Sequence, residues 1–191
     1  MRKLFILLSG FIIPLIASSQ TADSTRFSFK EFKVAPRVGI SYQKNLFTEF
    51  GISFNEYSVG FSKTGKYSNF GMGLFGGYIS SEILIRTDKT IIGPKIGFEF
   101  AGIGATAGGA YGIEFTYFSD FDKSSFAVTP KAGIPLGILE IYYGYSFFSN
   151  KDLKNYIGNH RFGISMNINR LYWKKQAAMM KEYRDYMGTQ K

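Results

Sequence analysis

Apolar and polar residues alternate along most of the chain, and the alternation is clearest from Ile91 to Ala101. One face of this stretch holds Ile92, Pro94, Ile96, Phe98 and Phe100, and the other holds Gly93, Lys95, Gly97, Glu99 and Ala101. A period of two is typical of a strand, because successive side chains point to opposite faces. In a membrane barrel the apolar face meets lipid, and small or charged residues point into the lumen. The stretch therefore predicts a strand of a membrane barrel.

The same pattern recurs and predicts eight strands with apolar outward faces. They are Val34–Gln43, Leu46–Ser58, Phe70–Leu84, Ile91–Ala101, Gly104–Tyr117, Phe126–Ile134, Ile138–Phe148 and His160–Asn169. In the third strand, Leu74 and Tyr78 are assigned outward, and residues 83–85 break the alternation. An even number of strands is typical of bacterial outer-membrane barrels. We therefore predict an all-β fold, an eight-stranded antiparallel transmembrane up-and-down β-barrel over residues 34–169, with a short C-terminal helical tail.

The two ends of the chain have a different composition from the barrel. Residues 1–19 are predicted to be a signal peptide, because Arg2 and Lys3 precede an apolar run that ends in small residues. The alternative, an uncleaved anchor, requires about 20 apolar residues, more than this run supplies. Residues 20–33 are predicted to be a polar leader. Residues 170–191 are predicted to be a periplasmic tail, which is either an amphipathic segment on the inner leaflet or a solvated helix.

Composition narrows the class of protein. The chain has 191 residues, 18% aromatic residues, 22 glycines and no cysteine. The absence of cysteine excludes a disulfide scaffold and a lipidated N-terminal cysteine. The formal charge of +9 falls to +7 when residues 1–19, with two basic residues and no acidic one, are removed. These charges are spread along the chain, so we expect contact with anionic lipid headgroups and not with nucleic acid.

Charged residues recur on the predicted inward faces. They are Arg37, Lys95, Lys131 and Arg161, with Glu49, Glu99, Glu114 and Glu140. Side chains fill the interior of an eight-stranded barrel, and an enclosed charge is costly unless it is paired and hydrogen-bonded. The sequence therefore predicts an internal ion-pair network and no open channel. The alternative is a soluble sheet with these charges in water.

A short pattern, Pro-[Arg/Lys]-x-Gly-[Ile/Phe], begins at Pro36, Pro94 and Pro130, and His160 begins a version without proline. The glycine lies inward, two residues after the base. We expect it to leave room for the long basic side chain. Because proline cannot donate to a ladder, we expect these prolines near strand ends or bulges.

The signal peptide, the alternating strands and the segment Asn159-His160-Arg161-Phe162-Gly163-Ile164 together resemble small outer-membrane β-barrel proteins of the OmpA/OmpX-like superfamily, over residues 34–169. The resemblance implies a monomer in the outer membrane of a Gram-negative cell. Its expected partners are outer-membrane lipid, lipopolysaccharide and the barrel-assembly machinery. Members of this group have structural, adhesive or lipid-modifying roles, so the resemblance does not choose among them. One departure is that this chain continues past Tyr172-Trp173.

His160, the only histidine, is the candidate catalytic base of a lipid A-modifying enzyme, with Ser146, Ser149 or Ser165 as nucleophile. A serine–histidine pair also needs a third orienting group, and the sequence has no signature for one. The sequence has no cysteine and no acidic cluster at ligand spacing, so it does not indicate a metal site. We therefore predict a barrel with no enzymatic activity and no cofactor, in a structural or surface-interaction role. A lipid A-modifying enzyme and a narrow, porin-like pore are the alternatives.

Overall fold

The computed structural model describes residues 25–64, 67–86, 89–104, 108–136 and 139–167, with Lys181 and Asp185. The strands in these ranges are β1 (Thr25–Gln43), β2 (Asn45–Thr64), β3 (Tyr67–Ile85), β4 (Thr90–Gly104), β5 (Gly108–Ser119), β6 (Ser124–Leu136), β7 (Leu139–Tyr145), β8 (Phe147–Phe148) and β9 (His160–Asn167). Among the described residues, no helix has the length and hydropathy needed to cross a bilayer.

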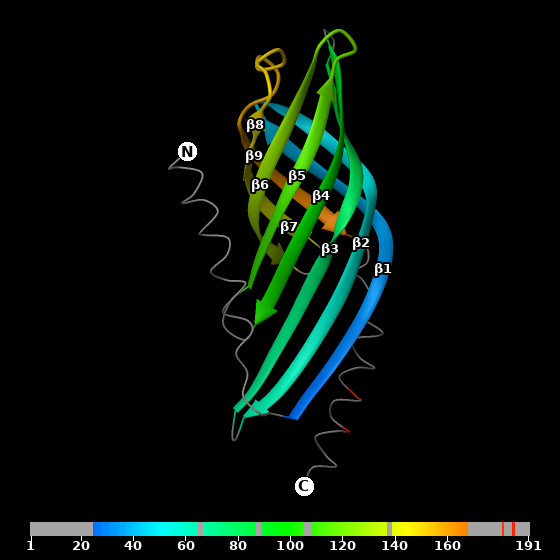
Figure 1. Cartoon of the computed structure of the whole chain (residues 1–191), viewed down its shortest axis with the longest axis vertical. Helices are drawn as coiled ribbons and strands as arrows, with labels where there is room; N and C mark the ends of the chain where they lie inside the picture. The colour runs from blue at the N-terminus through cyan, green and yellow to red at the C-terminus, as the bar shows by residue number, and fades with distance from the viewer. Residues whose placement is uncertain are drawn as a thin grey trace.

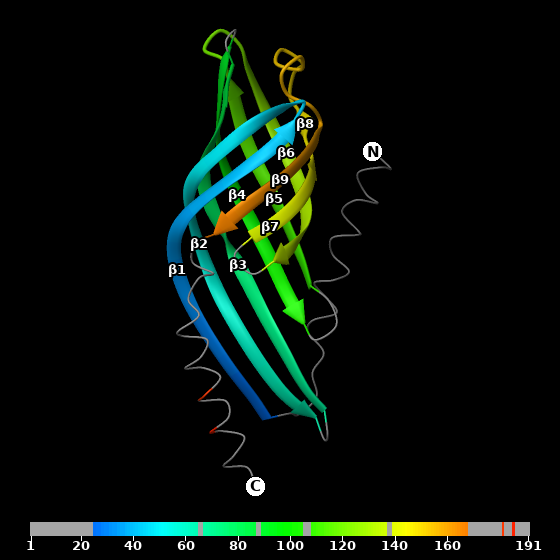
Figure 2. The same ribbon diagram turned by 180° about the vertical axis from the view of Figure 1, so that it is seen from behind.

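The sheet closes on itself. Each strand from β1 to β6 pairs antiparallel with the next, β9 pairs with β7, and β9 also pairs with Arg37–Tyr42 of β1. β7 and β8 are one long segment interrupted at Ser146, and both pair with β6. The result is a closed, eight-stranded, antiparallel up-and-down barrel, in which the last strand lies beside the first (Figures 1 and 2). This confirms the predicted all-β barrel.

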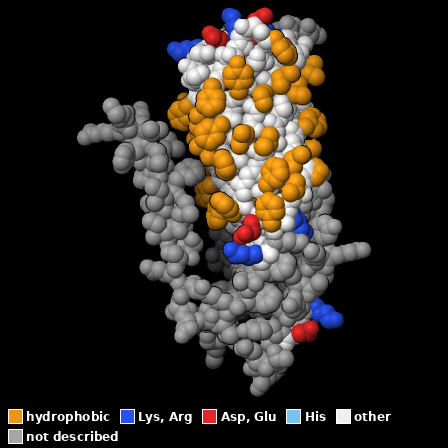
Figure 3. Space-filling model, turned by 45° about the vertical axis from the view of Figure 1, so that its right-hand side comes forward, with side chains coloured by type: hydrophobic (Ala, Val, Ile, Leu, Met, Phe, Trp, Pro, Cys, Tyr) orange, Lys and Arg blue, Asp and Glu red, His pale blue; other side chains and the backbone are white. Residues whose placement is uncertain are grey.

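The alternation in the sequence decides which side chains are enclosed. In β5, β7 and β9 buried and exposed residues alternate over most of their length. Large apolar residues such as Ile96, Phe98 and Ile141 are exposed on the outer surface, whereas the charged residues of the same strands are buried inside. Figure 3 shows the apolar side chains spread over the barrel wall, with charged side chains beyond both ends of this band.

The barrel has two different ends. Four connections meet at one end, which we call the loop end: Lys44, the β3–β4 connection with Arg86 and Lys89, residues 120–123 and residues 149–159. These are the connections after the first, third, fifth and seventh strands of the barrel, which lie on one side of an up-and-down barrel because neighbouring strands run in opposite directions. At the opposite end β1, β2 and β3 extend beyond the other strands (Figure 1).

Several predicted boundaries were wrong, and the second strand continues past Ser58 to Thr64. Residues 25–33, assigned to the polar leader, belong to β1, where Thr25 pairs with Lys63 and Lys33 with Asn55. The ladder that starts at the tight turn around Lys44 continues without interruption, so both strands of this hairpin are long. The turn predicted at residues 102–103 lies inside β4, because Gly102 pairs with Gly109 and Ile103 with Gly108.

The predicted inward and outward faces of the third strand were reversed. Leu74 and Tyr78 were assigned outward, but both are buried inside the barrel. Tyr78 lies opposite Ser53 of β2 and Gly97 of β4, which are inward positions, so the odd-numbered residues of β3 face outward. A one-residue slip exchanges the two faces of a strand, because the side-chain period is two. The buried Tyr78 hydroxyl is satisfied inside the barrel because it donates a hydrogen bond to the Glu114 carboxylate.

The predicted signal peptide (1–19) lies outside the described residues. So does the tail at 170–191, except for Lys181 and Asp185. Both stay predictions.

Candidate functional site: an enclosed network of ion pairs

The structure brings all eight predicted charged residues together inside the barrel. Each of them is 3% exposed or less. They come from β1 (Arg37), β2 (Glu49), β4 (Lys95 and Glu99), β5 (Glu114), β6 (Lys131), β7 (Glu140) and β9 (Arg161). Because they lie on inward positions of seven strands, closing the sheet points them at a common centre.

Arg37 and Lys95 share Glu49. The Arg37 guanidinium is 2.9 Å from Glu49 Oε1 and 3.0 Å from Glu99 Oε2. The Lys95 ammonium is 2.8 Å from Glu49 Oε2. Ser80 Oγ donates to Glu49 and Asn55 Nδ2 donates to Glu99, at 2.9 and 3.1 Å. The carboxylates thus have hydrogen bonds as well as opposite charges, which offsets the cost of enclosing them.

Glu114 is the centre of the network. Its carboxylate is 2.5 Å from Arg161, 3.5 Å from Lys131 and 3.7 Å from Lys95, and it accepts a hydrogen bond from Tyr78. The Lys131 ammonium also lies 3.8 Å from Glu99 and 3.5 Å from Glu140. These Lys131 contacts are longer than a direct hydrogen bond, so charge attraction accounts for them.

Sequence reasoning missed Glu82 of β3. It is fully buried, its carboxylate is 2.8 Å from Lys95, and it pairs with Arg161. Gln43 Nε2 also donates to it at 3.1 Å. The signal was present: if Ile79, Ile83 and Ile85 face outward, Glu82 faces inward.

The tyrosines Tyr78 and Tyr142 complete the network. Each lies directly opposite a glycine of the neighbouring strand, Tyr78 opposite Gly97 and Tyr142 opposite Gly163. A Cβ added at Gly97 would come within 2.2 Å of the Tyr78 ring, and one at Gly163 within 2.3 Å of the Tyr142 ring. Gly97 and Gly163, each two residues after a base, therefore make room for a tyrosine of the neighbouring strand. The expectation that they make room for the basic side chain of their own strand was wrong for these two.

The tyrosine rings also contact the bases. The Arg37 guanidinium lies 3.9 Å from the centre of the Tyr78 ring, and the Lys131 ammonium lies 4.9 Å from the centre of the Tyr142 ring. Cation–π attraction is strongest where water is excluded. Arg161 Nη2 also donates to the Tyr142 hydroxyl at 3.1 Å. The two rings therefore fill the interior and stabilise its cations.

With Glu82 included, the network holds four bases and five acids, a formal charge of −1 when all are ionised. Glu49 and Glu82 lie directly opposite each other in the β2–β3 ladder. Like charges in such positions destabilise a sheet. The Lys95 ammonium, at 2.8 Å from each carboxylate, compensates this repulsion.

An apolar cluster closes the interior at the loop end. It consists of Phe47, Leu84, Ile91, Phe118, Ala127, Leu153 and Ile157, with Phe148 and Tyr156 packed against it. Leu153 and Ile157 come from the 149–159 loop, and both are almost fully buried. The longest polar loop of the sequence therefore folds back over the barrel mouth.

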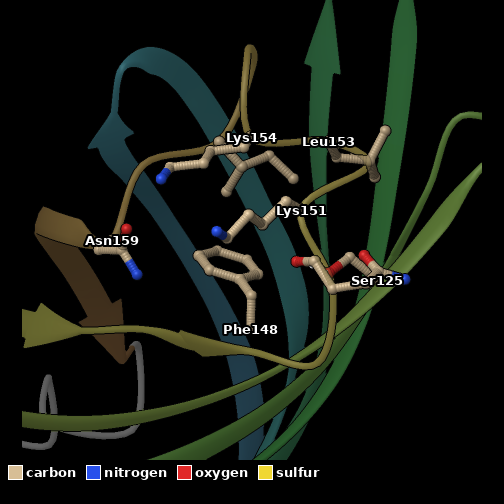
Figure 4. A pocket seen from close by; sticks show the side chains of 8 residues that line it. Ser125, Phe148, Lys151, Leu153, Lys154 and Asn159 are labelled. Carbon is tan, nitrogen blue, oxygen red and sulfur yellow. Dashed lines mark hydrogen bonds between the residues drawn. The ribbon is translucent and has the colours of Figure 1, made fainter.

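Hydrogen bonds anchor this loop on both sides. Asn159 Nδ2 donates to the Ser146 carbonyl, and the Ser146 N–H donates to the Asn159 carbonyl, both at 2.7 Å. Lys44 Nζ donates to the Lys154 carbonyl at 2.6 Å, and Asn150 Nδ2 donates to the Ser124 carbonyl at 2.8 Å. Next to the loop is a cavity of about 110 Å³, and its lining includes Phe148 and Leu153 (Figure 4).

Asp120 anchors the neighbouring hairpin. Its carboxylate is 2.5 Å from the Lys89 ammonium and accepts hydrogen bonds from the backbone N–H groups of Asp122 and Lys123. Desolvation by burial raises the pKa of Asp120, but the hydrogen bonds outweigh it and hold that pKa below its usual value. The hydrogen bond with Asp120 also raises the pKa of Lys89.

His160 lies on the outer surface, away from the candidate serines. Its Nδ1 and the Tyr143 hydroxyl are hydrogen-bonded at 2.8 Å. Ser146 and Ser165 are buried on the inner face, and Ser149 Oγ accepts a hydrogen bond from the Phe126 N–H. Within the described ranges, no hydrogen bond joins His160 to any of the three serines. The geometry therefore gives the serine–histidine alternative no support.

Among the described residues, no group of three or more His, Cys, Asp or Glu side chains is arranged to hold a metal ion. The class that fold and site define is a closed eight-stranded β-barrel whose interior is filled by paired charges. Comparison of the chain with protein-family models, with curated proteins and with solved structures gives no match.

Proposed function

We propose that the protein is a small integral β-barrel of the bacterial outer membrane, with a closed, non-conducting interior and a structural or surface-interaction role. The observation that carries the proposal is the inversion of polarity. Large apolar side chains cover the outer wall, and nine charged side chains are enclosed. In water this arrangement exposes far more contiguous apolar surface than a soluble monomer tolerates. In a bilayer the same wall is matched to hydrocarbon.

The height of the apolar band supports the proposal. On β1 it reaches from Phe32 to Tyr42, both exposed. Ten residues of strand at about 3.4 Å each, tilted by about 40°, span about 26 Å, close to the roughly 25 Å band of outer-membrane barrels. Glu56 lies opposite Phe32, and it forms an exposed ion pair at 3.2 Å with Lys30, which lies two residues beyond Phe32 on β1. The band therefore ends in charged residues at the level expected of a lipid headgroup region.

Two barriers in series support a closed interior. The ion-pair network fills the middle of the barrel, and the apolar cluster with Leu153 and Ile157 closes the loop end. An eight-stranded barrel has an interior that side chains fill. Planar-bilayer recording of the purified protein tests this point, because sustained conductance would contradict a filled interior.

Membrane insertion is tested by a pair of matched variants. Ile96 and Phe121 are both exposed, but Ile96 lies mid-strand in the apolar band and Phe121 lies at the tip of the β5–β6 hairpin. Lysine at the middle of a lipid-facing band costs about 2–4 kcal/mol, and lysine at the end of the band costs about 0–1 kcal/mol. We expect Ile96→Lys to reduce recovery in the membrane fraction and heat-modifiable gel mobility, whereas Phe121→Lys behaves like the parent. A mature chain that purifies as a detergent-free monomer, with both variants equally soluble, overturns the proposal.

A further inference from the structure

The outer face of β7, β8 and β9 carries a continuous aromatic patch: Tyr143, Tyr145, Phe147, His160 and Phe162. The Tyr145 ring meets the His160 and Phe147 rings edge-on, with centroids 5.2 and 5.1 Å apart. The Tyr143 ring lies 5.0 Å from Phe162. All five side chains are exposed on the outer surface. The patch therefore has ordered internal contacts and an open outer side.

The aromatic patch lies at the border between the apolar band and the loop end. His160 is the first residue of β9 and follows the 149–159 loop directly. In the β7–β9 ladder, His160 pairs with Tyr145 and Phe162 with Tyr143. From there the outward apolar residues continue along the strands through Ile141 and Ile164. An occupant of the patch therefore has apolar wall on one side and the loop on the other.

Lys44 lies beyond the patch at the loop end, two residues after Tyr42, which pairs with Phe162 of the patch. The Gly158 N–H donates to the Gln43 carbonyl at 3.0 Å, which holds the Lys44 turn against the loop two residues before His160. The Lys44 ammonium is fixed by its bond to the Lys154 carbonyl. With Lys151 and Lys154, the loop and turn hold three lysines against the single carboxylate of Asp152. The side chains of Lys151 and Lys154 are visible in Figure 4.

We propose that the aromatic patch and Lys44 bind the phosphate-bearing headgroup of a lipid in the surrounding leaflet. When the Tyr143 hydroxyl donates to Nδ1, the imidazole proton is on Nε2, which then donates outward to a phosphate oxygen. Lys44 supplies positive charge, and its ammonium has N–H donors for a phosphate oxygen besides the one bonded to the Lys154 carbonyl. The rings pack against the apolar part of the lipid next to its headgroup, the level at which tyrosines lie in membrane proteins. The inference rests on the proposed membrane location and names a partner for it.

The test uses the full mature chain in micelles of a zwitterionic detergent, with phosphatidic acid or phosphatidylcholine added and the retained lipid counted by native mass spectrometry. We expect preferential retention of phosphatidic acid. Replacing both His160→Phe and Lys44→Met lowers that retention about ten-fold, the loss expected for hydrogen bonds to a charged group. Tyr117→Phe, a tyrosine of the same outer wall on β5, is the matched control and leaves retention unchanged.

Two further arms separate the possible outcomes. Inorganic phosphate, added in excess, leaves phosphatidic acid bound if the site needs a lipid; displacement shows a free-phosphate site and overturns the proposal. Tyr143→Phe removes only a hydroxyl, and it carries the same test if the double variant does not fold. If the parent and all variants show heat-modifiable mobility and retain equal amounts of phosphatidic acid, the lipid site is refuted. The proposed membrane location is not affected by that result. A parent chain without such mobility refutes the proposed function itself.

Discussion

Replacing Lys95 with methionine tests whether the interior is a dry, paired network. Glu49 and Glu82 face each other across the β2–β3 ladder, and the Lys95 ammonium is 2.8 Å from each carboxylate. The two bound oxygens are therefore at most twice 2.8 Å, or 5.6 Å, apart. Methionine keeps most of the length of the side chain but removes the charge. The variant leaves two carboxylates facing each other and deprives Glu114 of one of its bases.

The expected magnitude follows from these distances. At an effective dielectric constant of about 20, two unit charges about 5.6 Å apart repel by about 3 kcal/mol. Removing one partner of a buried ion pair costs about 3–5 kcal/mol. We therefore expect the free energy of unfolding to fall by about 3–5 kcal/mol, which is a large part of the roughly 5–15 kcal/mol that stabilises a typical domain.

The assay is urea unfolding of the refolded mature protein in detergent micelles, followed by far-ultraviolet circular dichroism and gel mobility. Lys30→Met is the matched control, because Lys30 forms an exposed ion pair with Glu56 on the outer surface. That pair contributes at most about 1 kcal/mol. Adding Glu82→Gln to Lys95→Met removes one of the facing charges and restores about 2 kcal/mol or more. Equal losses from the two lysine variants, or no restoration by the second substitution, would refute the reasoning.

Three further predictions follow from single contacts. Gly97→Ala lowers the free energy of unfolding by about 1–3 kcal/mol, because its Cβ would collide with the Tyr78 ring, whereas Gly71→Ala, with open space around it, has little effect; urea unfolding of both variants checks this. The pKa of Asp120 is lower in the folded protein than its ordinary value of 3.8. Asp120 therefore contributes stability that is fully present when the pH is above that ordinary pKa, and this stability is lost as the pH falls through the pKa of the folded protein. Asp120→Asn therefore lowers the urea midpoint at about pH 7 and loses its effect at about pH 2, and equal effects at both pH values contradict the ion pair. Leu153→Asp lowers the free energy of unfolding by at least about 2–5 kcal/mol, because it places a charge in the apolar cluster at the barrel mouth. The same variant still shows no sustained conductance in a planar bilayer, since the ion-pair network stays in place; a steady current would show that the loop alone closes the barrel.

Much of the barrel and of its interior was predictable because the alternation of side chains is local. Lys95 and Glu99 fall on one face of any extended strand, and the neighbouring isoleucines and phenylalanines fall on the other. The same argument placed Arg37, Glu114 and Arg161 inside. The argument failed in β3, where it assigned Tyr78 to the lipid-facing side and did not include Glu82 among the inward charges. Local alternation does not say which face is which when both contain large side chains, and only pairing with β2 and β4 decides it.

By itself, the sequence determined the number of strands that form the barrel wall and, for most of them, the face that carries charge, since both follow from a two-residue period within each segment. Only the tertiary structure decided which charges meet, because partners such as Arg37 and Glu99 are 62 positions apart and are joined by closure of the sheet. The tertiary structure also decided that Tyr78 and Tyr142 occupy the space left by glycines of neighbouring strands. The same holds for Leu153 and Ile157, which lie in a polar loop by sequence but seal the barrel mouth, because burying them depends on an apolar cluster contributed by strands far away in the chain.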